Sequence, residues 1–175
     1  ELMRGEQAPL AIWRWPTTAE MRWQFWTAIQ QGAKGFFYFV YHGPKRGPGS
    51  TGESAKGLLG HDLKETPQYR IAADLGRQLE PLAPILLKLD VAPAERQTDF
   101  QGDSVVSVQV HIHRKTGGWF ISVVNNDWKK PQQIGGDAET WAGLLDEGEG
   151  LFDLRTGKAY DKASSMAPGD GTIYF

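Results

Sequence analysis

The spacing of hydrophobic residues changes near the middle of the chain. Up to about residue 90, apolar residues recur every three or four positions, which is typical of amphipathic helices. From residue 102 onward they alternate with polar residues, and alternation of this kind predicts strands with one buried face. The sequence therefore predicts an α/β first half and an all-β second half.

The first half predicts a helix, a strand and a second helix. Residues 17–31 open with Thr17 and Glu20 three positions apart, a capping box that satisfies free backbone amides at a helix start. Residues 35–41 form a continuous apolar and aromatic run, which favours a strand covered on both faces. Residues 66–87 open with Thr-Pro, a good cap followed by a good first helical residue.

Two prolines interrupt the second predicted helix. Pro81 and Pro84 lack the backbone N–H that the interior of a helix requires, so they should kink the helix or divide it in two. Residues 91–101 then have the character of a linker.

The second half predicts a small antiparallel β-sandwich. Val106, Val108, Val110 and Ile112 face one way, and the polar residues between them face the other. Short strands separated by glycine-containing turns are typical of such a domain. The other predicted strands are residues 119–124, 132–134, 151–154 and 172–175, and the predicted turns are residues 115–118, 155–158 and 168–171.

The α/β half offers too little structure to form a domain by itself. A buried parallel strand needs hydrogen-bonded neighbours, and this half supplies one strand between two helices. One buried strand with two flanking helices is what the end of a larger α/β domain contains. The chain also starts at Glu1 with no signal-peptide pattern, so we expect that a leader was removed or that the natural chain starts further upstream.

Composition narrows the possible partners. The formal net charge is -2 and no long basic run occurs, so nothing favours nucleic acid or an anionic membrane. The chain has no cysteine, which excludes disulfides and thiolate metal sites. It is rich in aromatic residues, with seven Trp, eight Phe and five Tyr, and aromatic rings form flat surfaces on which sugar rings stack.

Several segments resemble the end of the barrel and the appended domain of β-galactosidase-like glycoside hydrolases. The resemblance covers nearly the whole chain and is carried by the order of its motifs more than by any one of them. The barrel motifs are residues 14–22 (RWPTTAEMR), 32–39 (GAKGFFYF), 57–59 (GLL), 66–69 (TPQY) and 82–86 (LAPIL), and those of the appended domain are residues 123–127 (VVNND) and 153–158 (DLRTGK).

The resemblance implies a fold and a division of the chain. Residues 1–90 would be the C-terminal segment of a TIM barrel, with helix 7, strand 8 and helix 8 of a (β/α)8 barrel. Residues 91–101 would be a linker, and residues 102–175 an antiparallel β-sandwich domain. The rest of the barrel would come from a missing N-terminal portion or from a second chain. The compartment stays open, with the periplasm or the extracellular space slightly favoured.

The same resemblance implies part of a carbohydrate site without its catalytic acids. Glycosidases of this kind use two carboxylic acids, expected on barrel strands four and seven, which this chain does not contain. No catalytic residue is therefore assigned, and neither Glu20 nor Asp62 nor Glu65 matches a family carboxylate motif. The chain alone is expected to be inactive, and no cofactor or metal is assigned.

Aromatic residues near strand eight are the candidates for sugar contact. Tyr41 stands where the family has a large aromatic at the end of the strand, and His42 follows at the barrel mouth. Tyr38 within the strand, and Trp13 and Trp15 before the first helix, complete the set. Packing in the core is the alternative for each of them, since apolar side chains are mostly buried.

Two alternatives lie in the second half. A non-catalytic carbohydrate-binding or structural β-sandwich would use exposed Trp119, Trp128 and Trp141, or would bind no sugar at all. His111 and His113 share one strand face, a spacing that suits zinc or copper, but two ligands make an incomplete site.

Overall fold

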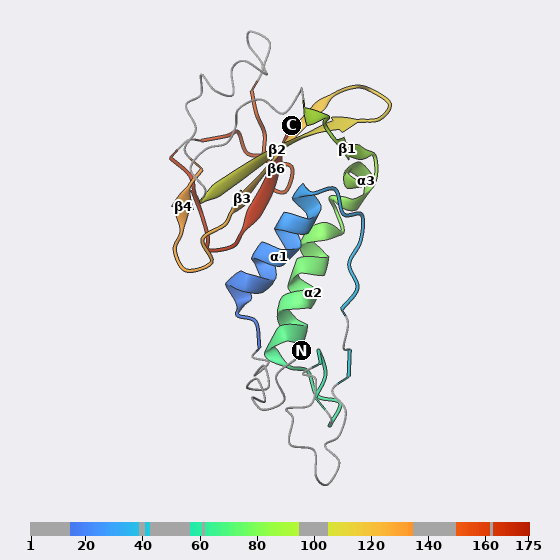
Figure 1. The fold of residues 1–175 in the computed structure, drawn as a ribbon, viewed down its shortest axis with the longest axis vertical. Helices are drawn as coiled ribbons and strands as arrows, with labels where there is room; N and C mark the ends of the chain where they lie inside the picture. Colours follow the sequence, from blue (N-terminus) through green and yellow to red (C-terminus); the bar gives the residue numbers. More distant parts are fainter. Residues whose placement is uncertain are drawn as a thin grey trace, which may run out of the picture.

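Two helices of 13 residues each lie side by side along one half of the molecule (Figure 1). The computed structural model describes residues 15–38, 41–42, 57–60, 62–94, 105–134, 150–161 and 163–175. Helix α1 (Thr18–Gln30) begins with the predicted capping box: Thr17 Oγ1 accepts a hydrogen bond from the Glu20 amide at 3.2 Å, and Glu20 Oε2 accepts one from the Thr17 amide at 2.8 Å. The predicted first helix is confirmed.

The second predicted helix is divided, as its prolines require. Helix α2 (Pro67–Leu79) is capped by Thr66, whose Oγ1 accepts a hydrogen bond from the Tyr69 amide at 3.2 Å. A short helix, α3 (Ala83–Leu86), follows after a turn. The break contains Pro81, whereas Pro84 lies in the first turn of α3, where a missing backbone N–H is tolerated.

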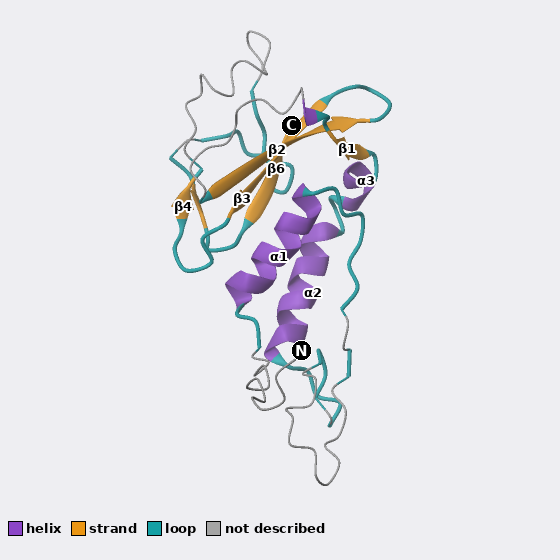
Figure 2. Cartoon of the chain, viewed as in Figure 1, coloured by secondary structure: helices purple, strands orange, loops and turns teal. Residues whose placement is uncertain are grey.

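All strands of the main sheet run antiparallel. Strands β1 (Leu89–Val91), β2 (Val106–His113), β3 (Trp119–Asn125) and β6 (Gly171–Tyr174) are hydrogen-bonded in the order β1-β2-β3-β6. A second, two-stranded sheet joins β4 (Gln132–Gln133) to β5 (Ser165–Met166). In Figure 2 the two long helices lie below the strands, and the short helix α3 lies beside β1.

The alternation along β2 places its side chains as predicted. Val106, Val108, Val110 and Ile112 belong to a core on the face of the sheet away from the helices. The opposite face packs against the helices. The buried residues of the core between helices and sheet are Phe25, Trp26, Ile29, Leu75, Leu82, Leu86, Leu89, Val124 and Ile173. Both faces of the sheet are therefore covered, which explains why so much of β3 is buried.

The observed architecture is a mixed α/β arrangement with a four-stranded and a two-stranded antiparallel sheet. Strand β1 was not predicted, and it crosses the expected boundary at residue 90. Its three residues are too few for alternation to be recognised. Leu89 pairs with His113 and Val91 with His111, so the chain enters the sheet before the expected linker.

The prediction of a regular buried strand at residues 35–41 is wrong for the part that the structure describes. Residues 33–38 have no ladder partner, and His42 makes a single parallel bridge to Leu59. Phe36 is half-buried, but Phe37 and Tyr41 are exposed. A strand needs neighbouring strands for its backbone hydrogen bonds, and no described segment provides them along residues 33–38.

Two glycines allow α1 to approach the turn that leads into β6. A Cβ at Gly169 would lie 2.1 Å from the carbonyl oxygen of Ala19, and φ at Gly169 is +66°. A Cβ at Gly171 would lie 2.6 Å from Cγ of Trp26. The predicted turn at residues 168–171 therefore also supplies the contact surface for the first helix.

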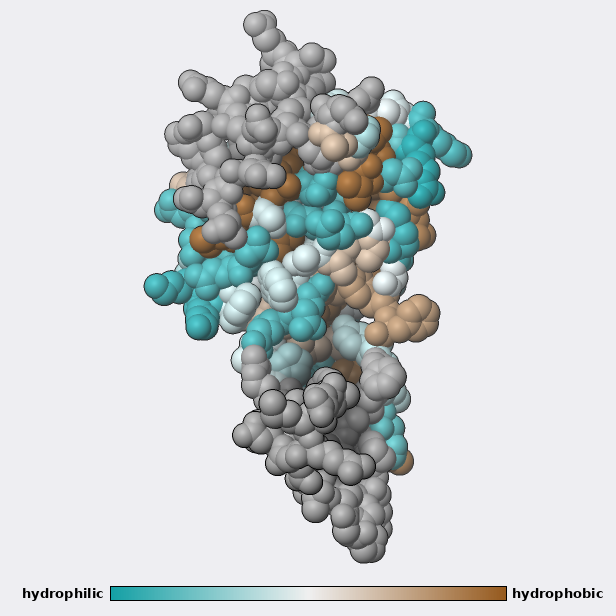
Figure 3. All heavy atoms as spheres, in the orientation of Figure 1, coloured by the Kyte–Doolittle hydropathy of each residue, from teal (hydrophilic) through white to brown (hydrophobic). Residues whose placement is uncertain are grey.

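Hydrophobic surface in the view of Figure 3 gathers over the half of the molecule that holds the strands. Exposed aromatic side chains in that half include Trp119, Trp128, Phe152 and Phe175. Among the described residues, no helix has the length and hydrophobicity to cross a bilayer.

Candidate functional site

The predicted sugar-contacting residues Tyr41 and His42 lie beside a tight loop that precedes α2. The Leu59 amide donates a hydrogen bond to the carbonyl oxygen of Tyr41 at 2.7 Å, and His42 bridges Leu59 in parallel. Leu59 in turn bridges Glu65 in the antiparallel sense. Three short segments thus lie side by side, and His42 and Glu65 are two strand spacings apart, or about 10 Å.

The loop itself is anchored to the helices. Leu58 is buried and packs with Met21 and Ala72, one from each long helix. The side chain of Thr66 donates a hydrogen bond to the Leu58 carbonyl oxygen at 2.6 Å, so the residue that caps α2 also closes the loop. This anchoring gives Tyr41 and His42 a defined place near the start of α2.

The side chains of the candidate residues are accessible. Tyr41 is 57% exposed, Tyr38 is 41% exposed and His42 is also exposed. Partial burial raises the pKa of the Tyr38 hydroxyl above its ordinary value, so this group stays protonated and can donate a hydrogen bond. Tyr38 and Tyr41 are thus surface aromatics rather than core residues in the described structure.

The other two candidates for sugar contact in the first half are Trp13 and Trp15. Trp15 is half-buried just before the capping residue of α1. Trp13 lies outside the described residues, as does Trp141 of the second half. The structure therefore brings Tyr41 and His42 together beside Leu59.

The carboxylates near this site serve local structure. Glu20 completes the capping box of α1. Asp62 accepts a hydrogen bond from the Lys64 amide at 3.2 Å, and this bond lowers the pKa of the Asp62 carboxyl. Glu65 lies 3.7 Å from Arg70 in an exposed ion pair. All three carboxylates are thus engaged in a cap, a loop or an ion pair of the described structure.

His111 and His113 are buried rather than solvent-facing. His111 Nε2 lies 2.8 Å from Ser122 Oγ, and His113 Nδ1 lies 3.0 Å from Thr116 Oγ1. Burial lowers the pKa of His111 to about 4, with Lys34 contributing to the shift, so His111 is neutral at pH 7. Within the described ranges no group of three or more metal-binding side chains occurs.

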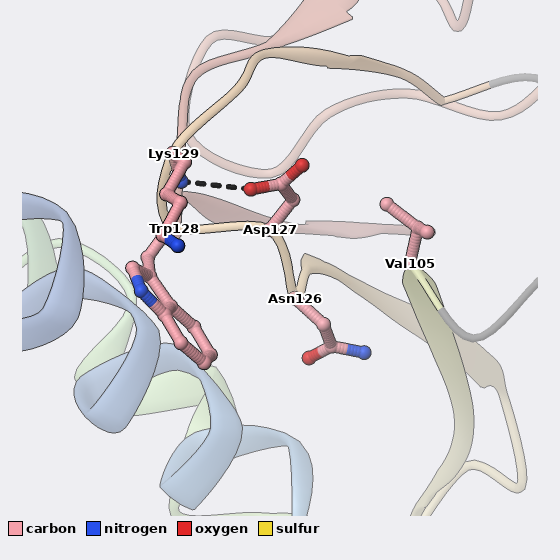
Figure 4. A pocket seen from close by; sticks show the side chains of 5 residues that line it. All are labelled: Val105, Asn126, Asp127, Trp128 and Lys129. Atoms are coloured by element: carbon pink, nitrogen blue, oxygen red, sulfur yellow. Dashed lines mark hydrogen bonds between the residues drawn. The ribbon is translucent and has the colours of Figure 1, made fainter.

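A hollow of about 280 Å³ lies where β3 ends, and the sequence did not predict it. It is lined by Val105, Asn126, Asp127, Trp128 and Lys129 (Figure 4). Trp128 was one of three tryptophans named for the alternative function. Trp23, a large aromatic residue of the predicted first helix, packs against Trp128. It was the feature of the sequence that could have indicated this hollow.

Comparison of the chain with protein-family models, with curated proteins and with solved structures gives no match.

Proposed function

We propose that this chain is the C-terminal part of a glycoside hydrolase, in which it supplies an aromatic wall of the carbohydrate site and not the catalytic carboxylates. In this proposal α1 is the seventh barrel helix, and α2 with α3 is the eighth helix. Residues 35–41, whose described part forms no ladder here, would become the eighth barrel strand when neighbouring barrel strands pair with them. Strands β2 to β6 belong to the appended β-domain, which packs against α1.

The exposed aromatic segment between α1 and α2 carries this proposal. Phe37, Tyr38 and Tyr41 present large apolar surface to solvent, and residues 33–38 have backbone groups outside any ladder of the described structure. Contiguous exposed apolar surface marks an interaction site. Neighbouring parallel strands would pair this backbone, and the aromatic side chains at the carboxyl end of the strand would then line the barrel mouth.

The single bridge between His42 and Leu59 supports the same arrangement. It is parallel, and it lies at the end of the aromatic segment, where a barrel strand would finish. Tyr41 would contact the sugar with its ring and His42 would donate or accept a hydrogen bond at a hydroxyl. The two catalytic acids would come from other barrel strands.

The first test is the mass and activity of the native protein. The proposal expects these 175 residues to occur joined to, or tightly bound to, a barrel portion that supplies the remaining strands. That material should hydrolyse at least one substrate in a panel of aryl glycosides. A folded monomer of 19.5 kDa with no partner and no glycosidase activity would overturn the proposal.

Substitution of Tyr41 tests its role within that material. Tyr41→Ala should lower kcat/KM by at least about tenfold, which corresponds to the roughly 1.4 kcal/mol of one modest contact at the transition state. The melting temperature should stay unchanged, because the side chain is 57% exposed. Leu87→Ala, at an exposed position after α3, is the control and should leave kcat/KM unaltered. Equal kinetics for both variants would remove Tyr41 from the site.

A further inference from the structure

The hollow at the end of β3 combines an open aromatic face with polar groups on one short loop. Figure 4 shows the indole of Trp128 standing between α1 and the hollow, with Asn126 and Val105 on the other side. Trp128 is 41% exposed, although it is a large aromatic. The hollow belongs to the connection between β3 and β4, not to the segment that carries Tyr41.

Trp23 of α1 holds the Trp128 side chain in position. The rings of Trp23 and Trp128 lie 5.5 Å apart at an angle of 53°, within the range of favourable aromatic pairs. Trp23 Nε1 donates a hydrogen bond to Asn126 Oδ1 at 3.0 Å, which ties the helix to the same loop. One side of the Trp128 indole is thus packed, and the rest of the ring stays available to a ligand.

The hydrogen bond from Trp23 also determines which group of the Asn126 amide remains available to a ligand. Its oxygen accepts the indole N–H, so its NH2 group is left as a donor, and in the described part of the chain that group has no hydrogen-bond partner. Figure 4 shows the Asn126 side chain at the edge of the hollow beside Trp128. A planar donor therefore lies next to the aromatic face.

The carboxylate of Asp127 holds the loop in shape. Its Oδ1 accepts hydrogen bonds from the amides of Lys129 at 2.8 Å and Lys130 at 3.1 Å, and its Oδ2 accepts one from Gln132 at 3.2 Å. The bond from the Lys129 amide holds the pKa of the Asp127 carboxyl below its usual range, so the group is ionised at neutral pH. Figure 4 shows this carboxylate pointing away from the Trp128 indole, so it stabilises the loop and does not face a ligand on that ring.

The loop is held rigidly by a buried asparagine. Asn125 is fully buried, its Oδ1 accepts from the Asp127 amide at 2.8 Å, and its Nδ2 donates to the carbonyl oxygens of Lys130, Met166 and Ala167. The Gly169 amide adds a hydrogen bond to the Asp127 carbonyl oxygen at 3.2 Å. A site held in place before binding loses less entropy when a ligand is bound.

We propose that this hollow binds a neutral saccharide unit, with the apolar face of a sugar ring on Trp128 and a hydroxyl group on the Asn126 amide. The volume of about 280 Å³ lies just below the roughly 300–1,000 Å³ of sites for drug-sized ligands, which suits one sugar ring of a longer chain. Asp127 and Lys129 carry opposite charges in the lining, so the hollow has no net charge that would favour an ionic ligand. This site is independent of the function proposed above, since it uses neither Tyr41 nor a barrel.

Binding should be weak and local. A single ring with one aromatic contact and one polar contact corresponds to a Kd of about 1 mM. The test is a titration of the isotopically labelled chain with cellotetraose, mannotetraose, xylotetraose and galactotetraose, followed by nuclear magnetic resonance. At least one of them should produce saturable shifts of the Trp128 indole N–H and the Asn126 side-chain amide.

Matched variants separate this site from the rest of the surface. Trp128→Ala should abolish the shift of the Asn126 amide, and Trp128→Phe should retain weaker binding through its smaller ring. Trp119→Ala is the control, because Trp119 is 38% exposed, close to the value for Trp128. Leu87→Ala, at an exposed position outside both sites, should also leave binding unchanged. The shifts are read at Trp128 and Asn126 and not in the segment of Tyr41, so failure here and failure of the proposed function are distinguishable.

Three results would overturn the proposal. The first is the absence of saturable shifts with all four oligosaccharides at about ten times the expected Kd. The second is binding that persists unchanged in Trp128→Ala, and the third is equal loss of binding in Trp119→Ala. If Trp128→Ala does not fold, the comparison of Trp128→Phe with Trp119→Ala decides the question.

Discussion

The substitution Gly171→Ala tests how α1 is seated on the sheet. A Cβ built at this position would lie 2.6, 2.7 and 2.8 Å from Cγ, Cβ and Cδ2 of Trp26. Trp26 is 1% exposed and Ile173, two residues along β6, is fully buried. The added methyl group would therefore meet the root of a rigid side chain inside a filled core.

The cost follows from these distances. Carbon atoms attract best at about 3.5–4.0 Å, so α1 would have to withdraw from β6 by about 1 Å. Overpacking of a core costs typically ~1–3 kcal/mol, and three simultaneous close contacts place Gly171→Ala near the upper end. The smaller conformational freedom of alanine in the unfolded chain returns about 0.5–1 kcal/mol. The net expectation is a loss of about 2 kcal/mol.

Thermal unfolding provides the assay. For a protein of this size, 1 kcal/mol corresponds to about 2–4 °C in Tm, so Gly171→Ala should melt about 4–8 °C below the wild type. Gly76→Ala is the matched control, since a Cβ at Gly76, in α2, meets no atom within 4 Å. It should raise stability by about 0.5–1 kcal/mol, because alanine is the better helix former. If Gly171→Ala melts at or above the wild-type temperature, the close approach of Trp26 to β6 is refuted.

Three further predictions concern buried polar groups and a helix cap. The pKa of His111 falls from 6.5 to about 4 in the folded chain. The free energy of unfolding should therefore keep the full contribution of neutral His111 above pH 6.5 and decline by at most about 3 kcal/mol as the pH falls toward 4. His111→Gln should reduce this decline in urea unfolding, and an unchanged pH dependence would contradict the prediction. Asn125→Asp places a carboxylate against three carbonyl oxygens and should lower the free energy of unfolding by about 3 kcal/mol or more at pH 7. Part of this stability should return at low pH, where the protonated acid can donate a hydrogen bond. An equal loss at both pH values would argue against this arrangement. Thr17→Ala removes the cap of α1 and should cost about 1 kcal/mol in thermal unfolding, whereas a cost near zero would mean that the capping box adds nothing to stability.

The helices and the central hairpin could be predicted because their signals are local. The capping pair Thr17 and Glu20 defines the start of α1 over three residues. Alternating valines predicted β2, and the predicted turn at residues 115–118 connects it to β3, with Ile112 opposite Trp119. Each signal acts between residues close in sequence, so no knowledge of the rest of the fold is required.

The burial of the polar face of β2 could not be predicted from local signals. The sequence placed His111 and His113 together on the polar face of β2, and that placement is confirmed. It did not indicate that this face would be covered. Gln30 of α1 donates hydrogen bonds to the carbonyl oxygens of Ser107 and Ser122, so a helix from the other half of the chain covers this face.

The two candidate sites also combine features visible in the sequence with features that depend on the fold. The aromatic character of residues 35–41 is a property of the sequence, but strand formation there depends on partners that the described residues do not supply. Trp128 could be named as a surface aromatic, whereas its hollow depends on Trp23, which is bound to Asn126 across 103 positions. The sequence by itself thus determined which segments form helices, turns and alternating strands, because those preferences arise within a few residues. Only the tertiary structure decided which faces are buried and which side chains meet, because these depend on contacts between segments far apart in the chain.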